Sequence, residues 1–140
     1  MERRTTGWYS HNLGMEMPLV AYGHAGYPLL MLPTAAADFL EYERFHLVES
    51  IRPLVEAGRV RAYSVNSVNR YSLMNEQAPP PWKGELLKRY DRYITDEVLP
   101  LIRHETGGQF LVQLPSVELF DVGQRVRVRP GRGPVAPLRD

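Results

Sequence analysis

Short apolar runs separated by glycine-containing turns dominate the first third of the chain. Gly7 to His11 is short and aromatic, Asn12 to Gly14 suits a turn, and Met15 to Tyr22 forms a second strand-like run. Two such runs joined by a short turn predict a β-hairpin. After a further turn at residues 23–27, Pro28 to Leu32 is continuously apolar. Such a run is typical of a strand buried on both faces of a parallel sheet.

The spacing of apolar positions then becomes helical. Apolar side chains recur at helical intervals between residues 42 and 57, which predicts a helix there. Because Pro53 lies inside this pattern, we expect a kink or break near Arg52. Gly58 suits the left-handed position that often follows a helix. Residues 60–65 read as the next strand.

A long polar stretch and a second helix follow. Residues 66–84 are predicted as a loop, and the continuous apolar stripe of residues 85–104 predicts a helix that Gly107 and Gly108 end. Strands alternating with helices favour parallel pairing through right-handed crossovers. The pattern therefore predicts an α/β fold, with a mainly parallel twisted sheet, flanking helices, and Leu29–Leu32 as the central strand.

The character of the sequence changes after Gly108. We expect three parts: an α/β domain over residues 1–108, a strand and hairpin extension over 109–129, and a disordered tail over 130–140. The segments expected within the extension are a strand at 110–114 and a hairpin of 117–122 with 124–128.

Composition narrows the function classes. A chain of 140 residues is long enough for one core, and a net charge of +1 argues against a dedicated nucleic-acid binder. The absence of cysteine excludes disulfides and thiolate metal ligands, and the histidines show no metal-ligand spacing. No apolar run is long enough to span a bilayer. These features predict a cytoplasmic protein with no cofactor, no metal and no membrane partner.

Several short motifs occur together in a recognisable order. They are Trp8-Tyr9-Ser10, Gly14-Met15-Glu16-Met17-Pro18-Leu19, Tyr22-Gly23-His24-Ala25-Gly26, Pro28-Leu29-Leu30-Met31-Leu32-Pro33-Thr34, Glu41-Tyr42-Glu43, Glu56-Ala57-Gly58-Arg59-Val60-Arg61, Val65-Asn66-Ser67-Val68 and Asp96-Glu97-Val98-Leu99-Pro100-Leu101-Ile102. This ordered set, over roughly residues 3–107, resembles a bacterial family of esterases with the α/β-hydrolase fold.

The resemblance implies where a site would lie. In that family the loop after the strand at residues 29–32 helps to form the oxyanion hole, which points to Thr34 and Ala35 as the remnant of that loop. Residues 35–37 are all alanine where the family often has a Ser-Gly-Gly-like sequence. Asn66 stands where an aspartate is usual.

The catalytic residues of such a hydrolase are not found. The family's nucleophile lies in a Gly-x-Ser-x-Gly-like elbow after the helix that ends near His104, and the match stops before that point. Ser116 lacks the small neighbours that an elbow needs. A hydrolase of this fold orders its triad as serine, acid, then histidine, but no histidine follows residue 104. We therefore assign no catalytic residue. The other histidines are His11, His24 and His46.

Two groups of charged residues have simple structural interpretations. Asp38, Glu41 and Glu43 are explained by a solvated helix start, where acidic side chains face the positive end of the helix dipole. Arg125, Arg127 and Arg129 alternate along one face of a predicted strand. They form either a patch for an acidic partner or a solvated face that keeps a sheet edge soluble, and we favour the second interpretation.

Three functional hypotheses remain open. The first is an incomplete esterase-like protein that is inactive alone. The second is a protein-interaction module that uses an open sheet edge and the arginine-rich hairpin. The third is an esterase whose missing half comes from another chain. An exposed apolar strand edge also predicts self-association, as a homo-oligomer with a sheet continuous through the interface.

Overall fold

The computed structural model describes residues 1–35, 37–108, 126–127 and 136–137. The chain divides into two compact units, Met1–Phe110 and Leu111–Asp140.

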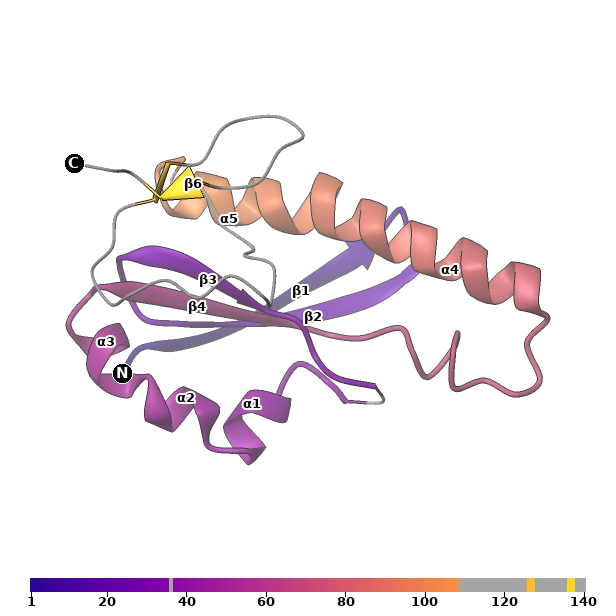
Figure 1. Cartoon of the computed structure of the whole chain (residues 1–140), viewed down its shortest axis with the longest axis horizontal. Coiled ribbons are helices and arrows are strands. Elements are labelled where there is room, and N and C mark those ends of the chain that lie inside the picture. The colour runs from indigo at the N-terminus through magenta and orange to yellow at the C-terminus, as the bar shows by residue number, and fades with distance from the viewer. Residues whose placement is uncertain (36, 109–125, 128–135, 138–140) are drawn as a thin grey trace. The chain divides into compact units, whose positions relative to one another are not determined.

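A four-stranded sheet forms the centre of the first unit (Figure 1). Its strands are β1 (Arg3–Ser10), β2 (Met15–Tyr22), β3 (Tyr27–Met31) and β4 (Val60–Val65), in the order β1-β2-β4-β3. β1 and β4 both pair with β2 antiparallel, whereas β3 and β4 are parallel. The α/β architecture is confirmed, but the sheet is mixed rather than mainly parallel. The reason is the hairpin, since a turn as short as residues 11–14 joins only antiparallel strands.

The strand expected at the centre of the sheet lies at its edge among the described strands. β3 pairs only with β4 there, and Tyr27 and Leu29 are 71% and 40% exposed. The strand buried on both faces is β4, whose residues 62–65 are fully buried. Position in a sheet depends on neighbours that are distant in sequence, so an apolar run alone does not determine which strand is central. Residues 110–114, expected beside β3, lie outside the described residues.

Three short helices cover one face of the sheet (Figure 1): α1 (Glu41–Arg44), α2 (Leu47–Ser50) and α3 (Arg52–Glu56). The predicted helix at 42–57 is confirmed in position, and the predicted break at its proline occurs where α3 begins. A second, unpredicted break lies at His46, which adopts a left-handed conformation with φ of 58°.

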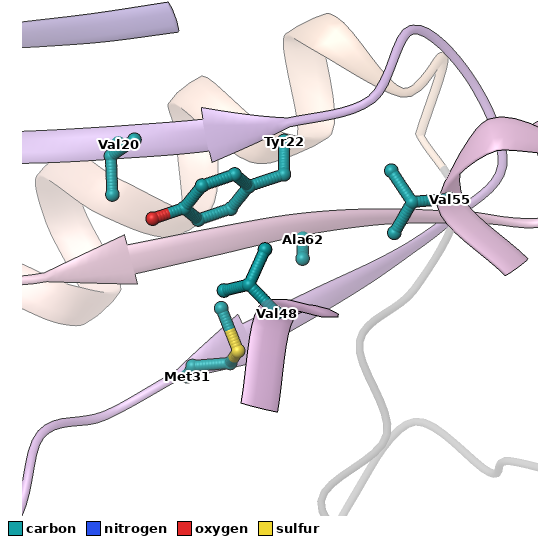
Figure 2. Packing of buried hydrophobic residues seen from close by; sticks show 6 residues of the cluster. All are labelled: Val20, Tyr22, Met31, Val48, Val55 and Ala62. Carbon is teal, nitrogen blue, oxygen red and sulfur yellow. The ribbon is translucent and has the colours of Figure 1, made fainter. Parts of the chain in front are cut away.

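Apolar side chains from the helices and the sheet meet in one cluster. Figure 2 shows Val48 of α2 and Val55 of α3 directed at the sheet. The sheet contributes Val20, Tyr22, Met31 and Ala62. All six residues are at most 5% exposed, so this packing fixes the short helices despite their length.

One long helical segment covers the opposite face (Figure 1): α4 (Pro80–Tyr93), the π-helix η1 (Ile94–Val98) and α5 (Leu99–Glu105). The predicted helix at 85–104 is confirmed but begins earlier, at Pro80, because proline suits the first helical turn. The π-helical turn precedes Pro100, which lacks an N–H and would clash with the Asp96 carbonyl in a regular α-helix. Gly107 and Gly108 both adopt positive φ and end the helix as expected.

Little of the second unit is described. β5 (Val126–Arg127) pairs antiparallel with β6 (Ala136–Pro137). The predicted hairpin strand at 117–122 lies outside the described residues, as do residues 125 and 129. No helix in the described part of the chain has the length and apolar character needed to cross a bilayer.

Candidate functional site at the carboxyl ends of β3 and β4

A hollow lies where the parallel strands β3 and β4 end. Because they are parallel, their carboxyl ends open onto the same side, where open α/β sheets usually bind ligands. The loops that leave these strands form a hollow of about 170 Å³. Its lining residues are Ala37, Asp38, Phe39, Asn66, Ser67, Arg70 and Tyr71.

Thr34, the residue that the resemblance assigns to the oxyanion loop, is bound by a carboxylate. Its backbone N–H donates to Glu41 Oε2 at 2.8 Å, and its hydroxyl donates to Glu41 Oε1. Glu41 is only 5% exposed. The carbonyl of Thr34 accepts the N–H of Ala37 at 3.0 Å. Glu41, expected as a solvated residue at a helix start, instead fixes the conformation of this loop.

Asn66 joins the two loops of the site. Its side-chain oxygen accepts the N–H of Phe39 at 3.0 Å, and its carbonyl accepts the Tyr90 hydroxyl at 2.8 Å. An aspartate would also accept the first bond. The amide makes this contact without placing a charge beside the hollow, so Asn66 acts here as a structural tie.

One ionised carboxyl group lines the hollow. Asp38 binds the Arg44 guanidinium at 2.8 Å and accepts the N–H of Leu40 at 2.9 Å. Burial raises the pKa of Asp38, but these hydrogen bonds and the charges of Arg44 and Arg70 outweigh it and lower the pKa overall. The hollow therefore contains a fixed negative charge beside a positive one.

The histidines lie away from this hollow. His11 is in the β1–β2 turn, 3.7 Å from a carboxylate oxygen of Glu97, and His24 is in the β2–β3 turn. His46 separates α1 from α2, and His104 lies on α5. None of the four is among the lining residues.

Neither Ser67 nor Ser116 is shown as an activated nucleophile. Ser67 lines the hollow, and its hydroxyl oxygen accepts the N–H of Asn69 at 3.0 Å, as in a local turn. Ser116 lies outside the described residues. In the part of the chain that the structure describes, no group of three or more acidic or histidine side chains is arranged to hold a metal ion.

A second polar centre, which the sequence did not indicate, surrounds Glu97 of the π-helix. Its carboxylate accepts hydrogen bonds from Trp8 Nε1 at 2.8 Å, Ser10 Oγ at 2.7 Å, and Asn12 Nδ2 and N at 2.9 and 3.4 Å. Burial raises the pKa of Glu97, but the hydrogen bonds from Ser10, Asn12 and Trp8 outweigh it and hold the pKa below its usual 4.5. This centre ties the long helix to the β1–β2 turn.

A similar centre surrounds Glu105 at the end of α5. Its carboxylate binds the guanidinium groups of Arg4 and Arg61 and accepts the Tyr63 hydroxyl at 3.0 Å. Burial raises the pKa of Glu105, but these partners lower it overall. In both centres the partners are distant in sequence, so no local pattern could have identified them.

No protein-family model matches the chain, and no curated protein matches it in sequence. Among solved structures, it is similar to an IroE-like serine hydrolase from Shewanella oneidensis, with a TM-score of 0.51 and 16% identity over 75% of this chain. An S-formylglutathione hydrolase (FrmB) from Staphylococcus aureus matches at a TM-score of 0.42 and 17% identity over 69% of this chain. An uncharacterised protein from Capnocytophaga ochracea matches at 0.49 and 15% over 75%.

This chain spans 39% of the Shewanella protein, 41% of the Staphylococcus protein and 30% of the Capnocytophaga protein. The likeness to the Shewanella protein supports a partial serine-hydrolase-like fold for the first unit. It identifies no activity, because the identity is low.

Proposed function

We propose that this chain forms part of an esterase-like α/β-hydrolase fold and, by itself, does not hydrolyse carboxylic esters. The observation that carries the proposal is the binding of Thr34 by the buried Glu41 carboxylate. Thr34 lies at the end of β3, in the loop that the resemblance assigns to the oxyanion hole.

An oxyanion hole works by aiming free N–H donors at the oxygen that becomes negative in the transition state. The N–H of Thr34 is already donated to Glu41, and the N–H of Ala37 is donated to the Thr34 carbonyl. A carboxylate at this point also repels a developing oxyanion. The observed loop thus opposes the charge that ester hydrolysis creates.

The other parts of the reaction are equally unsupported by the described residues. A serine nucleophile needs a histidine base within hydrogen-bond distance. In the part of the chain that the structure describes, the Ser67 hydroxyl donates no hydrogen bond to a histidine, and none of the histidines lines the hollow. Without an activated serine and its histidine, about 10⁶-fold of the rate enhancement of such a site is lost by the precedent of triad removal.

The test is an activity assay on the full chain with short-chain p-nitrophenyl esters, paired with a fluorophosphonate probe. We expect no turnover above the buffer rate and no covalent labelling. Ser67→Ala serves as the matched control, since Ser67 is the only serine among the described residues that line the hollow. Stoichiometric labelling of Ser67 or Ser116, or turnover that Ser67→Ala abolishes, would refute the proposal.

The second candidate function is that of an interaction module, and one observation favours it. β3 carries an apolar sequence, and among the described residues it pairs on one side only. Edge strands of this kind are templates for pairing with another chain. The same hypothesis assigns the arginine-bearing segment, with Arg125, Arg127 and Arg129, to the surface that binds the partner.

A further inference from the structure

The backbone groups of β3 that point away from the sheet form a distinctive row. The N–H of Tyr27 donates to the Arg59 carbonyl at 2.9 Å, and β3 and β4 pair in register from Tyr27 opposite Val60. In a strand the N–H and C=O of one residue point to the same side, and the side alternates with each residue. The polar groups of Pro28 and Leu30 therefore point away from β4, and continuing the alternation by one residue beyond β3 gives Leu32 the same direction.

Two hydrogen-bonding groups of this row are not available for a ladder. Pro28 has no N–H to donate. The carbonyl of Leu32 already accepts the hydroxyl of Tyr42. Within the described residues, the groups that remain for a ladder are the N–H and C=O of Leu30, the C=O of Pro28 and the N–H of Leu32.

We propose that β3 pairs antiparallel with β3 of a second copy of this chain, about a two-fold axis at Leu30. The two Leu30 residues then exchange both of their hydrogen bonds. Pro28 lies opposite Leu32 of the second copy, so the Leu32 N–H donates to the Pro28 carbonyl. The missing N–H of Pro28 falls opposite the Leu32 carbonyl that Tyr42 already occupies, and no group is left unpaired.

Other pairings lack this match. Shifting the register by two residues in one direction places the Pro28 ring opposite the free carbonyl of Leu30. The opposite shift places the Leu30 N–H against the occupied Leu32 carbonyl. A strand of ordinary sequence would likewise leave a carbonyl facing Pro28 without a donor, and a buried unpaired carbonyl is costly. The edge is therefore self-complementary, which identifies a second copy as its partner.

The side chains are consistent with self-pairing. β3 carries no charged residue, whereas β1, at the other edge of the described sheet, carries Arg3 and Arg4. Charges at an edge discourage pairing, and their absence permits it. In the proposed register, exposed Leu29 faces Met31 of the second copy on the sheet face covered by the short helices. This interface does not depend on the esterase-like function proposed above.

Single cysteines test both the pairing and its register, because the chain has no native cysteine. In the proposed dimer the two Leu30 Cα atoms are about 5.5 Å apart, within the range of a disulfide. The two Leu32 Cα atoms are about 14 Å apart along the strands. Mild oxidation should therefore crosslink Leu30→Cys into covalent dimers and leave Leu32→Cys without a covalent crosslink. Leu32 is more exposed than Leu30, so random collisions between molecules would crosslink Leu32→Cys more readily than Leu30→Cys. Preferential crosslinking of Leu30→Cys therefore reports the proposed register.

Light scattering on the unmodified full chain gives the second measurement. We expect a particle of twice the 16.1 kDa chain mass at tens of micromolar. Leu30→Pro should raise the dissociation constant at least tenfold, because it removes both central hydrogen bonds without touching the pairing with β4. Leu29→Lys should also weaken the dimer, whereas Leu73→Lys, at an exposed leucine of the loop after β4, should not.

The contrary outcomes are equally specific. A chain that stays monomeric at 100 μM (about 10⁻⁴ M, near the weak end of specific association) overturns the proposal, as expected if residues 110–114 occupy the β3 edge instead. Equal crosslinking of the two cysteine variants, or a dimer unaffected by both Leu30→Pro and Leu29→Lys, also overturns it. A circular dichroism spectrum of each variant separates dissociation from unfolding.

Discussion

Replacing Glu97 with alanine should reveal how strongly the π-helix holds the hairpin. The Glu97 side chain is 6% exposed, and its carboxylate is the acceptor for donors on Trp8, Ser10 and Asn12. Ser10 is fully buried, so its hydroxyl would lose its acceptor with no access to water, at about 1–3 kcal/mol. Trp8 and Asn12 are half-buried and can recover water, so each should contribute only about 0.5–1 kcal/mol. The expected loss in the free energy of unfolding is therefore about 3 kcal/mol.

Urea unfolding followed by circular dichroism measures this loss. The matched control is Glu85→Ala, because Glu85 is a glutamate of the same long helical segment that is 42% exposed and binds Arg89 and Arg92. Exposed pairs of this kind contribute little, so the control should change stability by no more than about 0.5 kcal/mol. If Glu97→Ala costs no more than Glu85→Ala, the carboxylate does not hold the hairpin and the reasoning is wrong.

Two further predictions concern acid stability and glycine positions. Although burial raises the pKa of Glu97, its hydrogen bonds hold it below 4.5, so the ionised group stabilises the fold above that pH and this contribution disappears as pH falls through the lowered pKa. Wild-type protein should lose stability more steeply than Glu97→Gln between about pH 6 and 3, and equal slopes would contradict the assignment. Gly26→Ala should destabilise by about 3 kcal/mol or more, because φ is +108° and the new Cβ would lie 2.3 Å from the Arg59 carbonyl carbon. Gly84→Ala, within α4 and with no atom within 4 Å of the new Cβ, should stabilise by about 1 kcal/mol, and thermal unfolding that ranks the two variants otherwise would refute this comparison.

The elements that local patterns determine were predicted well. The hairpin, the strand at 60–65 and the two helical regions follow from alternation, helical spacing and glycine punctuation, and all are present. The mainly parallel sheet was wrong, since the short hairpin makes the sheet mixed, and the prediction of β3 as the central strand stays untested because residues 110–114 lie outside the described residues. The left-handed break at His46 also has no sequence signal, since glycine or asparagine is the usual residue there.

The role of Thr34 and Ala35 in a site stays a prediction, while the structure shows the surroundings of the Thr34 loop. The resemblance put Thr34 at the end of a strand, and the structure places it after β3, close to the carboxyl end of β4. The interpretation of Glu41 as a solvated helix-start residue was wrong, since it is buried against Thr34. An acidic residue before an apolar helix suits either role, and only the path of the intervening loop decides between them.

The site and the proposed interface both lie on β3, and their geometry connects the two proposals. The hollow is at the carboxyl end of β3, whereas the interface runs along its outer edge. In an antiparallel pair the two carboxyl ends point in opposite directions, so the two hollows would lie on opposite sides of the two-fold axis. Continued past β3, the proposed register brings the β2–β3 turn of the second copy towards the Thr34 loop, and that turn contains His24 but no serine nucleophile. Dimerisation through β3 should therefore leave ester hydrolysis at background, and an activity that rises with the dimer fraction would contradict both the register and the role of Glu41.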